Sequence, residues 1–144
     1  KAQLSAGNKI PMGGTCFLSF VDTDKAHAAE IAGGLVKHGF KLVATKGTQS
    51  ILEKANIACE IVLKISEGRP NIEDSMKNDE ISMAINTSDN NTSKKDAIVI
   101  RQEVLKRNIP YFTTLSAARA LILALDEMKD DAWSNPKALQ DFLV

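Results

Sequence analysis

The stretch Phe40-Lys41-Leu42-Val43-Ala44-Thr45-Lys46-Gly47-Thr48 predicts a strand that turns directly into a helix. Residues 40–44 form a short apolar run, which is typical of a buried strand. Residues 45–48 combine two hydroxyls with a glycine, and a helical pattern follows through Ile51 and Leu52. A buried strand followed at once by a helix is the repeating unit of an α/β fold.

The segment before this stretch contains a strand and a helix of its own. Residues 15–21 are apolar and strand-like, and Asp24 is the expected N-cap of a helix that ends at Gly39. Apolar residues at helical spacing predict the buried face of that helix, namely Ala28, Ile31, Ala32 and Leu35.

Strands and helices continue to alternate towards the C-terminus. The expected elements are a strand at 60–65, a short helix opened by Pro70 and Asn71 and ending near Asn78, a strand at 81–85, an exposed polar loop at 86–95, a helix from Asp96, a short strand at Tyr111 and Phe112, and a helix at 117–128. Several of these strands are apolar on both faces, as in a parallel sheet covered by helices on each side. We therefore predict an α/β fold of three layers with about five parallel strands, in a doubly wound or flavodoxin-like order.

The composition is that of an ordinary globular domain. The 144 residues suffice for one domain, with 44% hydrophobic and 25% charged residues. Equal numbers of basic and acidic residues, 18 of each, exclude a disordered tail and a globally basic nucleic-acid binder. No apolar run approaches the roughly 18 residues of a membrane span, and the N-terminus lacks the apolar stretch of a secretory signal. We expect a cytoplasmic protein with no nucleic-acid or membrane partner.

Both ends of the chain are expected to lie outside the folded unit. Residues 1–14 contain glycine and proline with few anchoring apolar side chains, which is typical of a linker cut from something longer. Residues 129–144 predict a tail with one short helix begun by Ser134-Asn135-Pro136. The folded domain is therefore expected over residues 15–128.

The cysteines and histidines do not predict a metal site. Cys16 and Cys59 each lie in an apolar run with no partner at zinc-ligand spacing, and we expect both to be buried as small hydrophobic residues. His27 and His38 are expected near one face of the same helix, in solvated or capping roles.

The predicted strand order indicates where a ligand binds. In open parallel sheets, ligands bind outside the carboxyl ends of the strands. Hydroxyls and lysines are frequent among the residues expected there, which are Asp22, Asp24 and Lys25, residues 45–48, Lys64 and residues 67–69, residues 86–88, and Thr113 and Thr114.

This residue chemistry suits a phosphate. The turn at residues 45–48 places two hydroxyls and unpaired backbone N–H groups at a helix N-terminus, with Lys25 and Lys64 as sources of positive charge. The simpler alternative is that Thr48 is only an N-cap and Gly47 only a turn residue. Neither Gly-x-Gly-x-x-Gly nor Gly-x-x-x-x-Gly-Lys-Ser/Thr occurs, which disfavours a dinucleotide site and a P-loop.

A series of motifs occurs in order along the chain: Phe17-Leu18-Ser19 with Asp24-Lys25, Gly39 to Thr48, Lys64 with Glu67-Gly68-Arg69-Pro70-Asn71-Ile72, Ile85-Asn86-Thr87, Ile100-Arg101, and Pro110-Tyr111-Phe112-Thr113-Thr114-Leu115. Through these motifs the chain resembles the C-terminal regulatory domain of the carbamoyl-phosphate synthase large chain. The resemblance extends to about Leu125, and even the N-terminal Lys1-Ala2-Gln3-Leu4 looks like the junction to the preceding ATP-grasp half.

The resemblance implies a methylglyoxal-synthase-like fold with a five-stranded parallel sheet and a regulatory role without catalysis in this domain. The parent would be an ATP-dependent ligase that makes carbamoyl phosphate from bicarbonate and glutamine for pyrimidine and arginine biosynthesis. It would use ATP with Mg or Mn and K, and it would pair with a glutaminase small subunit. This domain itself would need no cofactor. UMP would bind as inhibitor and IMP as activator at one overlapping site, and ornithine at the boundary with the preceding domain.

The motifs that match the family imply a set of site residues in this sequence. Two departures concern the same loop: Ser88 stands where the family often has Thr, and residues 89–95 replace a Gly-Arg-Arg type sequence with Asp-Asn-Asn-Thr-Ser-Lys-Lys. The second exchanges arginine forks for lysine point charges beside the nucleotide, which leaves the identity of the effector open. The implied nucleotide-binding residues are Ser19, Lys25, Thr45, Lys46, Gly47, Thr48, Lys64, Asn86, Thr87 and Ser88, and Thr113 would face ornithine.

Two other functions are possible alternatives. A second family with this fold makes methylglyoxal from dihydroxyacetone phosphate, with an Asp in a Gly-Gly-Asp turn and histidines after strands one and four. Here the turn is Glu67-Gly68-Arg69, the first strand ends in Val21-Asp22, and the loop near Thr92-Ser93-Lys94 has no histidine, so the groups for acid–base chemistry are missing. The second alternative is an unrelated nucleotide-binding or scaffold protein.

Overall fold

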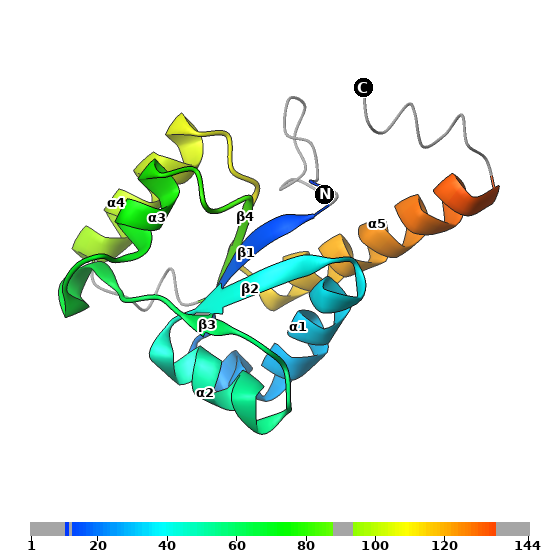
Figure 1. The fold of residues 1–144 in the computed structure, drawn as a ribbon, viewed down its shortest axis with the longest axis horizontal. Coiled ribbons are helices and arrows are strands. Elements are labelled where there is room, and N and C mark those ends of the chain that lie inside the picture. Colours follow the sequence, from blue (N-terminus) through cyan, green and yellow to red (C-terminus); the bar gives the residue numbers. More distant parts are fainter. Residues whose placement is uncertain (1–10, 12, 88–93, 135–144) are drawn as a thin grey trace.

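The computed structural model describes residues 11, 13–87 and 94–134 of the chain. Strands and helices alternate throughout (Figure 1). In chain order the elements are β1 (Gly14–Ser19), η1 (Asp22–His27), α1 (Ala28–Lys37), β2 (Phe40–Ala44), α2 (Lys46–Lys54), β3 (Glu60–Ile61), η2 (Ile65–Glu67), α3 (Ile72–Lys77), β4 (Met83–Asn86), α4 (Lys94–Lys106), β5 (Tyr111–Phe112) and α5 (Leu115–Ser134), where η denotes a 3₁₀ helix.

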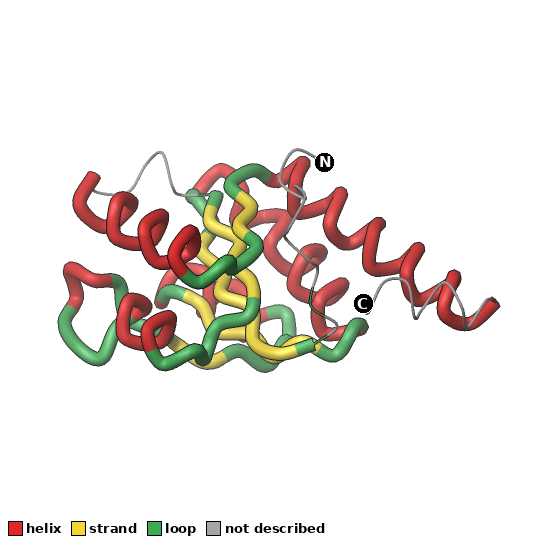
Figure 2. The backbone as a smooth tube through the Cα atoms, turned by 90° about the horizontal axis from the view of Figure 1, so that it is seen from above, coloured by secondary structure: helices red, strands yellow, loops and turns green. Residues whose placement is uncertain are grey.

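The five strands form one parallel sheet in the order β3-β2-β1-β4-β5. This arrangement confirms the predicted α/β fold and its doubly wound topology. It differs from the flavodoxin order, 2-1-3-4-5, because β3 pairs with the outer edge of β2 and leaves β1 beside β4. Figures 1 and 2 show the three layers, with α3 and α4 on one face of the sheet and α1, α2 and α5 on the other.

The alternation of side chains along β1 divides the core between the two faces. Cys16 and Leu18 point into the larger cluster, with apolar residues of α1, α2 and α5. Phe17, between them, points into the second cluster, with apolar residues of α3 and α4. A central strand buried on both sides reads as a continuous apolar run, which is why residues 15–21 predicted it. The predicted buried face of α1 is also confirmed, at Ala28, Ile31, Ala32 and Leu35.

Several element bounds differ from those predicted. Asp24 lies inside η1, and the N-cap of α1 is His27, because the chain forms a 3₁₀ turn before the α-helix begins. Only Glu60–Ile61 of the expected strand 60–65 forms a ladder, and a single bridge from Leu63 to Asn71 follows it. At the other end, α5 continues to Ser134 and includes residues 129–134 of the predicted tail. Residues 135–144, and residues 1–10 of the expected linker, lie outside the described residues.

Two predictions of exposure and burial are wrong. Asn86 and Thr87 open the loop that was expected to be exposed, but both are buried, because β4 runs to Asn86 and Thr87 packs against the segment after β1. Cys16 is fully buried as predicted, whereas Cys59 is only partly buried, since it precedes the short edge strand β3.

The two histidines flank α1, where they occupy its N-cap and C-cap positions. Both contact α5. The Nε2 atom of His38 is 2.7 Å from Oδ1 of Asp126, and Arg119 lies 3.2 Å from Nδ1 of His27 while it also pairs with Glu30. The histidines thus occupy the cap positions of α1, but His27 makes no side-chain cap bond, and the contacts of both histidines join α1 to α5 across their outer surface.

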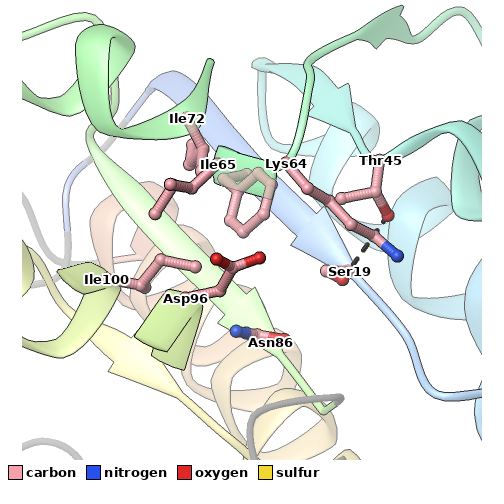
Figure 3. Close-up of a pocket in the computed structure, with 9 residues that line it drawn as sticks. Ser19, Thr45, Lys64, Ile65, Ile72, Asn86, Asp96 and Ile100 are labelled. Carbon is pink, nitrogen blue, oxygen red and sulfur yellow. Dashed lines mark hydrogen bonds between the residues drawn. The ribbon is translucent and has the colours of Figure 1, made fainter. Parts of the chain in front are cut away.

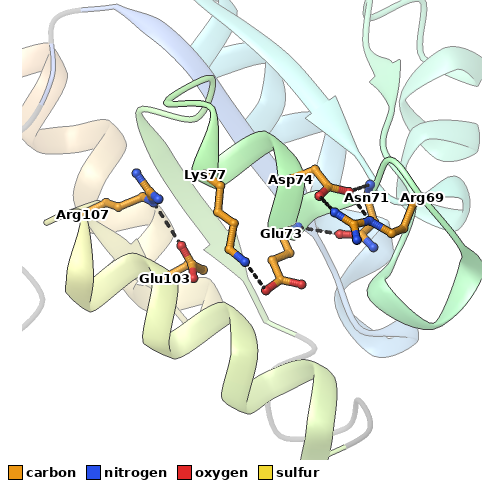
Figure 4. Close-up of polar contacts among 7 residues, drawn as sticks. All are labelled: Arg69, Asn71, Glu73, Asp74, Lys77, Glu103 and Arg107. Carbon is orange, nitrogen blue, oxygen red and sulfur yellow. Dashed lines mark hydrogen bonds and ion pairs between the residues drawn. The ribbon is translucent and has the colours of Figure 1, made fainter.

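The helix α3 owes its sharp start to side-chain caps (Figure 4). Asn71 accepts a bond from the backbone N–H of Glu73, and Asp74 accepts one from the backbone N–H of Asn71, both at 2.9 Å. Arg69 donates to the Asp74 carboxylate, and this bond holds the pKa of Asp74 below its usual range. These bonds fix the turn between Lys64 and α3. Each helix in the described ranges is too short or too polar to span a membrane.

Gly14, at the start of β1, generates a test of the fold. Its φ is +111°, and an added Cβ would lie 2.9 Å from the Cβ of Ser82 and overlap its hydroxyl. Gly14→Ala should therefore lower the free energy of unfolding by about 1–3 kcal/mol, through backbone strain and overpacking. Gly13→Ala is the matched control, because no atom lies within 4 Å of its added Cβ. Equal urea midpoints for the two variants would contradict this account.

Candidate functional site

The carboxyl ends of β1, β2 and β4 lie side by side at one edge of the sheet. The parallel register pairs Ser19 with Asn86 and Leu18 with Ala44, so Thr45 follows β2 next to Ser19. The strand order reverses between β1 and β4, because β2 and β3 extend to one side and β5 to the other. A reversal of this kind is where ligands bind in doubly wound sheets.

A pocket opens at this edge on the side of α3 and α4 (Figure 3). Its wall is part apolar and part polar, a combination typical of small-molecule sites. The apolar side chains are Phe17, Ile65, Ile72 and Ile100, and the polar ones are Ser19, Thr45, Lys64, Asn86 and Asp96.

The start of α2 borders the pocket and has no side-chain cap. Thr45 occupies the N-cap position, yet its hydroxyl donates to Oγ of Ser19 at 3.4 Å instead of accepting from the helix. The first intrahelical bond runs from the N–H of Gln49 to the carbonyl of Thr45, so the N–H groups of residues 46–48 precede it. These N–H groups and the helix dipole favour an anion at this point.

Lys25 reaches the same helix start from η1. A Cβ added to Gly47 would lie 2.8 Å from Nζ of Lys25, so glycine at this position is what lets the ammonium come so close. Nζ also donates to Oδ1 of Asp22 at 2.7 Å. The pKa of Asp22 lies below its usual range, chiefly because of this hydrogen bond and the charge of Lys25, with a further contribution from Lys64. Positive charge from both lysines therefore converges beside the start of α2.

Thr48 and Thr87 accept hydrogen bonds from the backbone that follows β1. Oγ1 of Thr48 accepts from the backbone N–H of Phe20 at 3.0 Å, and Oγ1 of Thr87 accepts from that of Val21 at 3.1 Å. The N–H of Thr87 in turn donates to the carbonyl of Ser19 at 2.9 Å. Both side chains are buried, and they fix the segment that leads from β1 into η1. This segment carries Lys25, so the threonines set the position of the lysine.

The structure brings most of the expected site residues together. Ser19, Thr45, Lys64 and Asn86 line the pocket, and Asn86 donates to the hydroxyl of Tyr111 at 3.1 Å. Lys25, Lys46, Gly47 and Thr48 gather at the start of α2, with Lys46 and Gly47 exposed. Thr87 and Thr113 are not among the residues that line the pocket. Thr87 bonds to the segment after β1, and Thr113 follows the edge strand β5. Ser88 lies outside the described residues.

Asp96 is a charged residue of the pocket that was not predicted from the sequence. It lies in the first turn of α4, is buried, and lines the pocket opposite Ser19 and Lys64 (Figure 3). A signal for it existed, because the helix that follows the fourth strand must begin at the carboxyl edge of the sheet. A carboxylate there can accept hydrogen bonds from ligand hydroxyls. Among residues 11, 13–87 and 94–134, no three His, Cys, Asp or Glu side chains come close enough to hold a metal.

The fold and the pocket define the chain as a doubly wound α/β domain with a polar pocket at its switch point. A family model for the MGS-like domain matches residues 27–113. The chain belongs to this family, which confirms the fold that the sequence motifs implied.

Its relatives include large chains of carbamoyl phosphate synthase. The large chain from Helicobacter pylori strain J99 is 51% identical over 143 residues, which are 99% of this chain and 13% of the relative. The C-terminal section of the Methanopyrus kandleri large chain is 42% identical over 131 residues, 90% of this chain and 24% of the relative. The arginine-specific, chloroplastic large chain from Oryza sativa subsp. japonica is 43% identical, with 99% of this chain and 12% of the relative covered. The chain thus spans less than a quarter of each of these relatives.

The bond from Phe20 to Thr48 can be tested directly. Thr48→Val removes the acceptor while it keeps the shape of the side chain, so the buried Phe20 N–H loses its partner, at a cost of about 1–3 kcal/mol. Hydrogen exchange of the Phe20 amide should then accelerate relative to the Thr45 amide, which bonds to Leu18. Thr48→Ser keeps the hydroxyl and should leave this ratio unchanged. An unchanged ratio in Thr48→Val would show that the hydroxyl does not hold this segment.

Proposed function

We propose that the chain is the allosteric regulatory domain of a carbamoyl phosphate synthase large chain, and that it binds nucleoside monophosphate effectors in the pocket at the switch point. UMP would inhibit and IMP would activate. The observation that carries the proposal is the uncapped start of α2, bordered by the ammonium of Lys25 and by a pocket that Lys64 lines.

The phosphate would bind at the start of α2. Backbone N–H groups of residues 46–48, the hydroxyls of Ser19 and Thr45, and the two lysines supply donors on adjacent sides. Charge-assisted hydrogen bonds of this kind each contribute roughly 1.5–3 kcal/mol, which is more than a neutral hydrogen bond contributes. The phosphate should therefore provide most of the binding free energy.

The nucleoside would occupy the part of the pocket against α3 and α4. Phe17, Ile72 and Ile100 offer an apolar wall for a base, and the Asp96 carboxylate suits ribose hydroxyls. The Asn86 amide, oriented by its bond to Tyr111, suits the sugar or the base edge. Because these residues would contact the sugar and the base rather than the phosphate, changes to them should alter the ratio of UMP to IMP affinity more than the overall affinity.

The names of the relatives support the parent protein, while its cofactors and its small subunit stay predictions from the sequence motifs. The parent would be the glutamine-dependent ligase that uses ATP with Mg or Mn and K, with this domain joined in cis to the rest of the large subunit and a glutaminase small subunit in the complex. The Oryza sativa relative is called arginine-specific, which supports a role in arginine biosynthesis, and the role in pyrimidine biosynthesis stays a prediction. Thr113, half-buried after β5, would contribute to an ornithine site, and a cytoplasmic location stays a prediction.

This domain would regulate without catalysis of its own. Methylglyoxal formation needs an electrophile beside the substrate carbonyl, for which the related family uses histidine. The chain has two histidines, and both contact side chains of α5 on the face of the sheet away from the pocket. Asp96 places a carboxylate in the pocket, but no imidazole accompanies it there.

Calorimetry with nucleotides and nucleosides tests the proposal. UMP and IMP should bind at least about 10-fold more tightly than uridine and inosine, because the nucleosides lack the charged group that the start of α2 and the lysines accept. Lys25→Ala should weaken nucleotide binding by a similar factor, and raised salt should weaken it further. A separate titration with ornithine tests the second site.

Lys54→Ala is the matched control for Lys25→Ala. Lys54 lies in the last turn of α2, so its loss removes the same charge from the opposite end of the same helix. The nucleotide affinity of the Lys54→Ala variant should stay within about twofold of that of the unmodified chain, because the charge of Lys54 lies at the end of α2 far from the pocket. Equal affinity for nucleosides and nucleotides, or equal losses in the two lysine variants, would show that the phosphate does not bind at the start of α2.

A further inference from the structure

Lys25, a cation at the proposed phosphate site, already forms an ion pair with a carboxylate of the chain, that of Asp22. Oδ1 of Asp22 lies 2.7 Å from Nζ of Lys25, three residues later in η1. The Asp22 side chain is 92% exposed, whereas that of Lys25 is 26% exposed. The ion pair therefore has its cation packed against the protein and its anion in solvent.

The position of this cation is electrostatically unfavourable by itself. Nζ of Lys25 lies against Gly47, in the first turn of α2, where the helix dipole places positive charge. Lys64 adds a second cation to the same region. Asp22 offsets both contributions, and the lowered pKa of its carboxyl reports that Lys25 and Lys64 act on it.

We propose that Asp22 is a built-in counter-anion of the phosphate site, which holds Lys25 over the start of α2 in the free protein and competes with a ligand's phosphate for it. This inference rests on the proposed function, since it requires a phosphate at that helix start. Asp22 is a positioning residue, because it acts on the ligand through Lys25.

The competition follows from charge. A phosphate monoester carries close to two negative charges at neutral pH, and its oxygens accept from the same donors that now face Asp22. Once the phosphate binds, the Asp22 carboxylate lies near a second negative group. Lys25 is then attracted to both the carboxylate and the phosphate. Removal of the Asp22 charge should therefore tighten phosphate binding. Because the carboxylate is exposed, the effect should be modest and sensitive to salt.

Calorimetric titration of the 144-residue chain with inorganic phosphate and with UMP provides the test. In low salt, Asp22→Asn should bind both probes roughly 3- to 5-fold more tightly than the unmodified chain, and the gain should shrink as salt is raised. Asp24→Asn is the matched control: it removes the same charge from the same 3₁₀ turn, and Asp24 forms no ion pair within the described part of the chain. Its affinities should stay within about twofold.

A double-mutant cycle shows whether Asp22 acts through Lys25. In a Lys25→Met background, Asp22→Asn should change the affinity for UMP by less than about twofold, because the competition for the ammonium no longer exists. Unchanged or weaker binding in Asp22→Asn alone, an equal gain in Asp24→Asn, or a full gain in the Lys25→Met background would overturn the inference. Absence of UMP and phosphate binding by the unmodified chain would instead overturn the proposed function, and the inference with it.

Discussion

The parallel pairing of β1 between β2 and β4 is the constraint on which the rest of the molecule depends. It buries Phe17 on one face and Leu18 on the other, so helices must cover both sides of the sheet. It also brings the carboxyl ends of three strands to one edge. Ser19, Thr45 and Asn86 become neighbours there although they are far apart in the chain.

The segments that follow these strands line a pocket at that edge and place charge beside it. Thr48 and Thr87 hold the backbone after β1, which carries Asp22 and Lys25 to the start of α2. The absence of a side chain at Gly47 lets the ammonium approach. The hydroxyls at this edge thus have two roles: those of Thr48 and Thr87 hold the backbone in place, and Ser19 and Thr45 line the pocket. The ion pair of Asp22 and Lys25 places two opposite charges beside the start of α2.

The sequence predicted the elements that have strong periodicity and missed those decided by tertiary contacts. The bounds of β2 and the buried face of α1 follow from local pattern, and both are confirmed. The short length of β3 is decided by its pairing, because only Glu60 and Ile61 find partners on β2. Hydroxyls and lysines after strands indicated the site, but the pattern does not tell whether Thr48 faces a ligand or Phe20. Asp96 was missed because it follows a polar loop: the start of its helix is predictable at the carboxyl edge of the sheet, but its burial in the pocket depends on the packing of α4.

Backbone NMR during titration with UMP tests the location of the site most directly. The account predicts that the largest amide shifts occur at residues 46–48, whose N–H groups precede the first intrahelical bond of α2, with smaller shifts around Asn86 and Asp96. A second groove lies between α1 and α5, lined by Glu30, Ile31, Arg119, Ile122 and Leu123. Largest shifts in that groove, with residues 46–48 unchanged, would contradict the central claim that the carboxyl edge of the sheet binds the phosphate.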